Sequence, residues 1–152
     1  MDNLTFEEEL DRHGSFLYTN TGFSMWPMIR PGKDLVEISR RPAERLKRFD
    51  VALYRCRGCY ILHRVLRVRA DCYLIAGDHN YRTERVTDDQ IIGILSAVIR
   101  DGNRSELQGL RYRLYLLLWC DLFPLRAGIL WICAAARRIL GKAFSFCKSA
   151  GR

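Results

Sequence analysis

Short, largely apolar segments recur along the first hundred residues of the chain, with polar residues between them. These segments are rich in β-branched and aromatic side chains, and Gly, Pro, Asp or Asn residues separate them, as is typical of strands joined by turns. The expected strands cover residues 15–19, 35–39, 51–55, 60–68, 72–76 and 91–99. Strands this short and this closely spaced predict a mostly β protein, built as a coiled antiparallel sheet or partial barrel.

A short helix is expected before the first strand. Residues 4–10 have an amphipathic pattern, and Thr5 and Glu8 have the spacing of a capping box. The same N-terminal segment is acidic and lacks both a basic region and an apolar core, so it does not have the pattern of a secretory signal.

A second helical region follows the strands. Residues 114–136 are dense in Leu, Trp, Phe, Ile and Ala, but Asp121, Pro124 and Arg126 interrupt them. Because a charge at mid-membrane costs about 2.5–3.5 kcal/mol, these interruptions disfavour a spanning helix. We expect two helices, at about 111–121 and 125–140, that lie on a membrane surface or dip into it. A helical hairpin packed on the sheet or on a second subunit is the alternative.

Charge is distributed unevenly over the 152 residues. Lys and Arg number 25 against 17 Asp and Glu, a net charge of +8. Residues 1–99 hold 15 basic and 14 acidic side chains, whereas residues 100–152 hold 10 and 3. A basic tail on a nearly neutral body favours an anionic membrane surface as partner and argues against nucleic acid. The sequence thus predicts a domain over 1–104 and a membrane-associated tail over 105–152, on the cytoplasmic face.

The cysteines have a spacing that needs interpretation. Cys56 and Cys59 form a CxxC pair, but Arg57-Gly58 between two apolar runs predicts a two-residue hairpin turn with the thiols at the strand ends. A zinc or redox site would need Cys72 or His79 to converge on the pair. The expectation is reduced thiols and no metal.

Three segments hold residues suited to acyl transfer. Ser24 lies in a stretch rich in Gly and Pro, where a nucleophile can be exposed beside backbone N–H groups. His63 lies on a predicted strand and shares a face with Ile61 and Val65. Asp78 follows a strand and a Gly. Each also has a plain structural interpretation, as a turn former, a buried strand histidine and an Asx-turn residue.

Together and in this order, the segments resemble the S24/S26 serine peptidase superfamily of signal peptidases and LexA-like self-cleaving repressors. The superfamily's G-x-S-M-x-P box is matched by residues 22–27, its two G-D-x-V elements by 32–36 and 49–53, and its G-D-x-N box by 77–80. The resemblance covers about residues 15–99. It implies the superfamily's coiled β fold and a serine endopeptidase with Ser24 as nucleophile and no cofactor.

The superfamily divides by its general base. The sequence has no Lys between Lys47 and Lys142, so the Ser–Lys dyad of bacterial type I signal peptidases and of LexA-like repressors is unavailable. The His63-Arg64-Val65 sequence resembles the endoplasmic-reticulum and archaeal type, which pairs Ser with His. An imidazole with a pKa near 6.5 can take the serine proton near neutral pH.

The motifs leave open which acid orients His63. In His-type relatives it lies a few residues beyond the G-D-x-N box, where this chain has Thr83 and Glu84. We favour Asp78; Glu84 as the acid, or a Ser–His dyad, are the alternatives. Some relatives also carry a hydroxyl two residues before the nucleophile, where this chain has Gly22, so the Ser24 N–H is expected to hold the oxyanion with less help.

The substrate is expected to be a peptide or protein that binds as an added β-strand. The residues expected to line its groove are Met25, Pro27 and Ile61. Two other functions remain open. A LexA-like self-cleaving regulator would need a DNA-binding domain before Ser24, and a non-catalytic module that binds peptides or tethers a partner to the membrane would not need the serine and the histidine.

Overall fold

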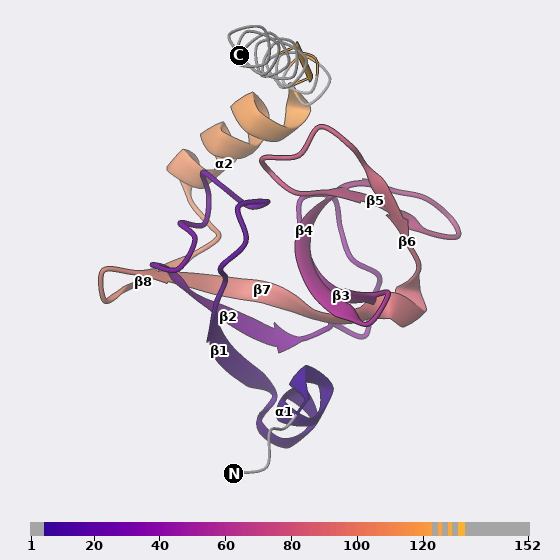
Figure 1. Cartoon of the computed structure of the whole chain (residues 1–152), viewed down its shortest axis with the longest axis vertical. Coiled ribbons are helices and arrows are strands. Elements are labelled where there is room, and N and C mark those ends of the chain that lie inside the picture. The colour runs from indigo at the N-terminus through magenta and orange to yellow at the C-terminus, as the bar shows by residue number, and fades with distance from the viewer. Residues whose placement is uncertain (1–4, 123–124, 126–127, 129–130, 133–152) are drawn as a thin grey trace, which may run out of the picture.

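The computed structural model describes residues 5–122, 125, 128, 131 and 132, as Figure 1 shows. The helices are α1 (Phe6–His13), the 3₁₀ turn η1 (Asp88–Gln90), α2 (Leu110–Leu116) and the π-helical turn η2 (Leu117–Asp121). The strands are β1 (Ser15–Thr19), β2 (Leu35–Arg40), β3 (Val51–Cys56), β4 (Cys59–Val68), β5 (Tyr73–Ala76), β6 (Glu84–Val86), β7 (Ile91–Arg100) and β8 (Asn103–Glu106). Every predicted strand is confirmed. The short strands β6 and β8 were not predicted.

All eight strands belong to one antiparallel sheet that does not close. Its order is β1-β2-β7-β3-β4-β5-β6, and β8 pairs with the end of β7 beyond β3. The register shifts in the β2–β7, β3–β7 and β4–β5 pairs. Such bulges bend and twist strands, and Figure 1 shows β3, β4, β5 and β6 curling round on themselves. The predicted mostly β, antiparallel architecture is confirmed as an open, curled sheet.

The hydrophobic core has two parts, one on each face of β4. The first core lies beneath α1, β1 and β2, and Leu62 of β4 belongs to it. The second core fills the inside of the curl and contains Tyr54, Val65 and Tyr73. Because successive strand residues alternate between faces, His63 points to the side of the second core and Arg64 to the opposite side.

The predicted N-terminal helix forms two residues later than expected. The Thr5 hydroxyl accepts a hydrogen bond from the Glu8 N–H, and the Glu8 carboxylate accepts one from the Thr5 N–H, which completes the capping box. Gly14 ends the helix with a φ of 74°, in the left-handed region. Leu10 is the residue that α1 buries in the first core.

The β3–β4 hairpin has the predicted two-residue turn. Arg57 and Gly58 both have positive φ, at 51° and 79°, as a type I′ turn requires. Cys56 and Cys59 face each other as the last pair of the ladder, and both are free thiols. Within the described part of the chain, no group of three or more His, Cys, Asp or Glu is placed to hold a metal ion.

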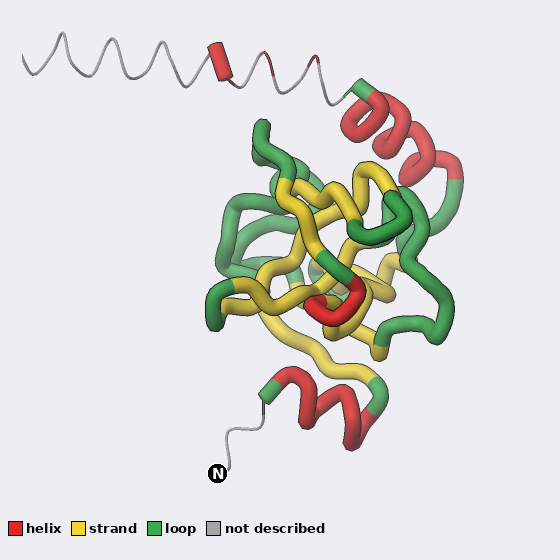
Figure 2. Tube along the Cα trace, turned by 90° about the vertical axis from the view of Figure 1, so that its right-hand side faces the viewer, coloured by secondary structure: helices red, strands yellow, loops and turns green. Residues whose placement is uncertain are grey.

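The helix α2 and the turn η2 together form the first of the two helices expected in the tail. They lie at the end of the sheet opposite α1, as Figures 1 and 2 show. Most of the second expected helix, 125–140, lies outside the described residues. Among the residues that are described, no helix has the length and hydrophobicity needed to cross a bilayer.

Candidate active site

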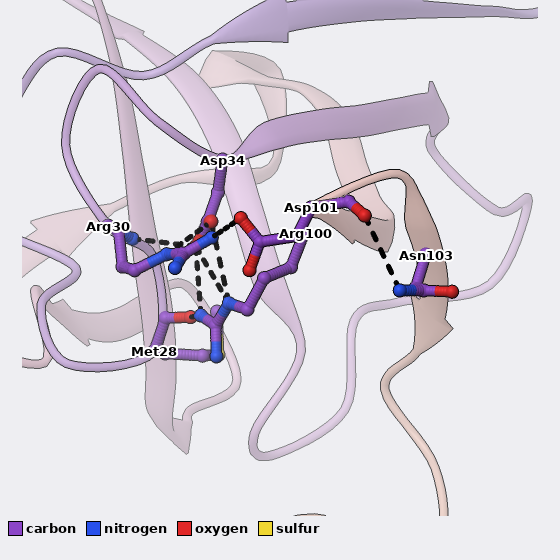
Figure 3. A network of polar contacts seen from close by, with 6 residues as sticks. All are labelled: Met28, Arg30, Asp34, Arg100, Asp101 and Asn103. Carbon is purple, nitrogen blue, oxygen red and sulfur yellow. Dashed lines mark hydrogen bonds and ion pairs between the residues drawn. The ribbon is translucent and has the colours of Figure 1, made fainter.

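Ser24 lies in the loop that joins β1 to β2, and a buried ion-pair network holds this loop. Asp34, at the end of the loop, is fully buried and accepts hydrogen bonds from the Arg30 guanidinium at 2.7 Å and the Arg100 guanidinium at 2.8 Å. Figure 3 shows both side chains converging on Asp34, with Arg100 also bound to the Met28 carbonyl. Burial by itself would raise the pKa of Asp34, but the hydrogen bonds from Arg100 and Arg30 outweigh it and lower the pKa below its ordinary value.

The 77–80 turn lies directly against Ser24. The His79 N–H donates to the Ser24 carbonyl at 2.7 Å, and the Asn80 N–H closes the turn on the Gly77 carbonyl at 2.9 Å. A Cβ on Gly77 would lie 2.5 Å from the Ser24 carbonyl oxygen and 2.9 Å from the Ser24 Cβ. No side chain fits at that position, so glycine permits the close approach.

The strand register brings Ser24 to the face of the sheet that carries His63. Arg64 of β4 pairs with Ala76, the last residue of β5, and the same register continued by one residue places Gly77 across from His63. Directly opposed residues project to the same face, with Cβ atoms about 4.5–5.5 Å apart. The Ser24 Cβ lies against the space that a Gly77 side chain would take, on the face of the sheet that carries His63. The Ser24 hydroxyl has no hydrogen-bond partner among the described residues, so it is not bonded to His63.

His63 is buried, with 4% of its surface exposed, between a tyrosine and a carboxylate. Its Nδ1 lies 3.0 Å from the Tyr54 hydroxyl and 4.0 Å from Glu84 Oε1. The Tyr54 hydroxyl also donates to Glu84 Oε2 at 2.6 Å, so it bridges the two side chains. Burial lowers the pKa of His63, and the negative charges of Glu84 and Asp78 oppose that shift only in part. The ring is therefore neutral at neutral pH.

Asp78, which we expected to orient His63, is engaged on the other face of the sheet. Its carboxylate forms a two-pronged, fully buried ion pair with Arg64, at 2.8 and 2.7 Å, and accepts a hydrogen bond from the Tyr115 hydroxyl. No hydrogen bond joins Asp78 to His63. Strand alternation explains this arrangement. Successive residues project to opposite faces, so Arg64 lies on the face opposite that of His63, and Asp78 on the face opposite that of Gly77. The acid beside His63 is Glu84, the alternative expected from the sequence.

The three residues expected to line a substrate groove have separate environments. Met25 is fully buried in the first core and has no surface for a substrate, which corrects that expectation. Pro27 lines an open groove of about 670 Å³ between the Ser24 loop, β8 and α2, together with Met28. Ile61 is half-buried against the second core, on the same face of β4 as His63.

Backbone donors are available next to the Ser24 hydroxyl. Within the described residues, the N–H groups of Ser24 and Met25 have no hydrogen-bond acceptor, although their neighbours Gly22 and Trp26 do. Two free N–H groups at a nucleophile are the arrangement that stabilises a tetrahedral oxyanion. The chain thus has a second candidate donor, the N–H of Met25, in addition to the one expected from the sequence.

Two side chains of the site were given no role from the sequence: Tyr54, and Arg64, which entered only as part of the His63-Arg64-Val65 signature. The position of Tyr54 could have been predicted from the register of the hairpin. A two-residue turn at Arg57-Gly58 makes Ala52 the partner of His63, so Tyr54, two residues later, projects to the same face one step along. For Arg64 the signal was weaker, because its partner depends on the pairing of β4 with β5.

Comparison with known proteins gives no assignment for the chain. No protein-family model matches it, and a search of curated proteins finds no match. Its function is therefore inferred from its own motifs and geometry.

Proposed function

We propose that the protein is a serine endopeptidase of the S24/S26 type, with Ser24 as nucleophile and His63 as general base. One observation carries the proposal most directly: Ser24 packs over Gly77, which directly follows β5 and lies across from His63 when the β4–β5 register is continued by one residue. The segments that meet there, 22–27, 60–65 and 77–80, are the ones whose sequences resemble the superfamily's catalytic boxes.

The chemistry follows the general logic of serine hydrolysis. The Ser24 hydroxyl attacks the substrate carbonyl carbon while the His63 Nε2 removes the hydroxyl proton. The backbone N–H groups of Ser24 and Met25 hold the oxyanion of the tetrahedral intermediate. His63 then gives the proton to the leaving amine, and water, deprotonated by the same ring, hydrolyses the acyl-enzyme.

Apolar side chains near the nucleophile suit a peptide substrate. Phe23 and Trp26 flank Ser24 closely in the chain, and 69% and 44% of their surfaces are exposed. Burial of exposed aromatic rings is a strong source of binding energy. We propose that these two rings, with Pro27 and Ile61, contact the substrate, and that Met25 supports the loop from the core.

The tail supports a proposal of membrane association. The exposed face of the helix that α2 and η2 form carries four leucines, which we call the leucine stripe: Leu110, Leu114, Leu117 and Leu118. The first three are spaced four and three residues apart, and the last two are adjacent. The opposite face packs on the domain through hydroxyl and indole contacts. Because Arg111 and Arg113 accompany this leucine stripe, an anionic membrane surface is its natural partner, and we place the protein on the cytoplasmic face.

A non-catalytic peptide-binding module is the second candidate. The observation in its favour is that the Ser24 hydroxyl makes no hydrogen bond to His63 in the structure. Catalytic hydrogen bonds of this kind often tighten only when substrate binds, so activity has to be measured directly.

The decisive experiment is cleavage of a peptide library in detergent, read by mass spectrometry. Wild type is expected to cleave, and both Ser24→Ala and His63→Ala to reduce cleavage at least about 10³-fold, since serine and base act as a unit. Ser15→Ala, which removes a hydroxyl at the start of β1 next to α1, is the matched control and should leave the rate unchanged.

Each contrary outcome has a definite meaning. Cleavage that survives in Ser24→Ala excludes this nucleophile. Peptides that bind wild type and both variants equally, with no cleavage, indicate the binding module. Loss of mass from the chain itself, dependent on Ser24, indicates a self-cleaving protein.

A further inference from the structure

The bridge between His63 and Glu84 carries a consequence for the proton on the imidazole. We propose that Tyr54 is a positioning residue through which Glu84 fixes the tautomer of His63, with the proton on Nδ1 and the lone pair on Nε2. The catalytic part of this inference rests on the proposed function, whereas the tautomer itself does not.

Counting donors and acceptors leads to this assignment. A tyrosine hydroxyl has one proton to donate, and an ionised carboxylate can only accept. The Tyr54 hydroxyl lies 2.6 Å from Glu84 Oε2, a short distance typical of a bond to a charged acceptor, so its proton points to Glu84. Towards His63 the tyrosine oxygen can then only accept. Nδ1, at 3.0 Å, must therefore carry the hydrogen.

The surroundings hold this arrangement in place. Tyr54 is fully buried in the second core, so its ring has little freedom. Burial and the hydrogen bond to Glu84 both raise the pKa of the Tyr54 hydroxyl, which keeps its proton at all ordinary pH values. Glu84, by contrast, retains 43% side-chain exposure, so water stabilises its charge while one oxygen binds Tyr54.

With this tautomer, Tyr54 orients the His63 ring, a role that a carboxylate bonded directly to Nδ1 fills in a serine triad. With Nδ1 protonated, Nε2 is the basic nitrogen and can take the Ser24 proton. When Nε2 becomes protonated, the imidazolium donates from Nδ1 to a tyrosine oxygen already polarised by Glu84. No proton is transferred between His63, Tyr54 and Glu84, because the carboxylate acts only by polarising the tyrosine hydroxyl. Asp78, bound to Arg64 on the other face, is free of this task.

The tautomer can be measured without reference to activity. Protein labelled with ¹⁵N-histidine is examined by long-range ¹H–¹⁵N correlation at about pH 8, where imidazoles are neutral. The chain has 3 His, and the exposed His13, whose Nε2 lies 3.8 Å from Glu9 Oε2, gives a surface ring for comparison in the same sample. His63 is expected to show a protonated Nδ1 and an unprotonated Nε2.

Two variants test the bridge, and a third is their control. Tyr54→Phe removes the acceptor for the Nδ1 hydrogen, and Glu84→Gln removes the charge that directs the tyrosine proton. Both are expected to shift His63 towards a mixture of tautomers. Tyr73→Phe removes another buried hydroxyl of the second core, one that binds Asp88 and not His63, and should leave the His63 signature unchanged.

The result that would overturn the proposal is a wild-type His63 protonated on Nε2, or a pure Nδ1–H signature that persists in Tyr54→Phe. If peptidase activity is found, Tyr54→Phe should lower kcat at least about tenfold and leave KM little changed, whereas loss of an orienting acid in a serine triad costs up to about 10⁴-fold. If no activity is found but the tautomer holds, only the proposed function fails.

Discussion

At the scale of single residues, two neighbours on β4 divide the chemistry of the site. His63 faces the inside of the curl, with Tyr54 and Glu84, while Arg64 faces outward and is fully buried against Asp78. Removing one partner of a buried ion pair leaves an uncompensated charge, so Arg64 and Asp78 act first as structural residues of the 77–80 turn.

The pH dependence of catalysis should follow His63. Its pKa lies below 6.5, mainly because of burial, so the acid limb of kcat/KM is expected below that pH, with full activity at neutral pH. Glu84 raises this pKa, so Glu84→Gln should move the acid limb to still lower pH. Asp89→Asn, an exposed change elsewhere, should leave it in place. A limb that moves to higher pH in Glu84→Gln would contradict the assignment of Glu84.

Gly77→Ala should disturb Ser24 directly. The added methyl meets the Ser24 carbonyl oxygen and Cβ at distances that no real Cβ adopts, so the loop or the turn must shift. We expect at least about a tenfold loss of kcat/KM and a loss of about 1–3 kcal/mol in the free energy of unfolding. Gly128→Ala, where the new methyl meets none of the described residues within 4 Å, is the matched control. Full activity in Gly77→Ala would argue against the placement of Ser24.

At the scale of elements, the helix formed by α2 and η2 has two unlike faces. Its polar aromatic face binds the domain: the Tyr112 hydroxyl accepts from Arg64, the Tyr115 hydroxyl donates to the Asp78 carboxylate, and the Trp119 indole donates to the Asp78 carbonyl. Its leucine stripe is exposed. The helix is thus joined, through Asp78, to the same turn that contacts Ser24.

Vesicle binding should depend on the leucine stripe. The double variant Leu114→Glu/Leu118→Glu places two charges on it and is expected to reduce sedimentation with anionic vesicles at least about tenfold, because both apolar burial and charge attraction are lost. Leu17→Glu, the same change at an exposed leucine of β1, is the control. Unchanged binding in the double variant would assign the stripe to a protein partner or to a second copy of the chain.

At the scale of the whole molecule, buried ion pairs fasten the irregular segments to the sheet. Asp34 joins the Ser24 loop to β7 through Arg100, and Asp78 joins the 77–80 turn to β4 through Arg64. Both carboxylates are buried, and each accepts hydrogen bonds on both oxygens. Buried ion pairs therefore fix the loops of the site, whereas hydrophobic packing stabilises the sheet.

Acid should weaken the fold through Asp34. Its pKa is lower in the folded protein than its ordinary value of 3.8, so it stabilises the fold above that pH, and this contribution is lost as the pH falls through the lower folded value. Asp34→Asn is expected to cost about 1–3 kcal/mol near neutral pH, because the Arg30 and Arg100 side chains left behind are 34% and 44% exposed, and to flatten the acid dependence of unfolding, measured by denaturant titration. Asp89→Asn is the exposed control. Equal acid slopes in wild type and Asp34→Asn would exclude this role.

Much of the fold could be predicted because its signals are local. Apolar, β-branched and aromatic segments between turn residues indicated six of the strands, the Thr5–Glu8 spacing gave the capping box, and Arg57-Gly58 gave the hairpin. The strand β6 escaped prediction because it has only 3 residues, and β8 because its sequence, Asn-Arg-Ser-Glu, contains no apolar residue.

For the site, the sequence by itself determined which residue types are present and on which segments they lie: a serine in a tight loop, a histidine on a strand and a glycine before Asp78. Only the tertiary structure decided which of these residues contact one another. The β4–β5 register put Asp78 on the face of Arg64 and Gly77 opposite His63, and the curl of the sheet brought Glu84 to Tyr54. The physical reason is that a strand's faces are a local property, whereas the partner across each face depends on pairing between distant segments.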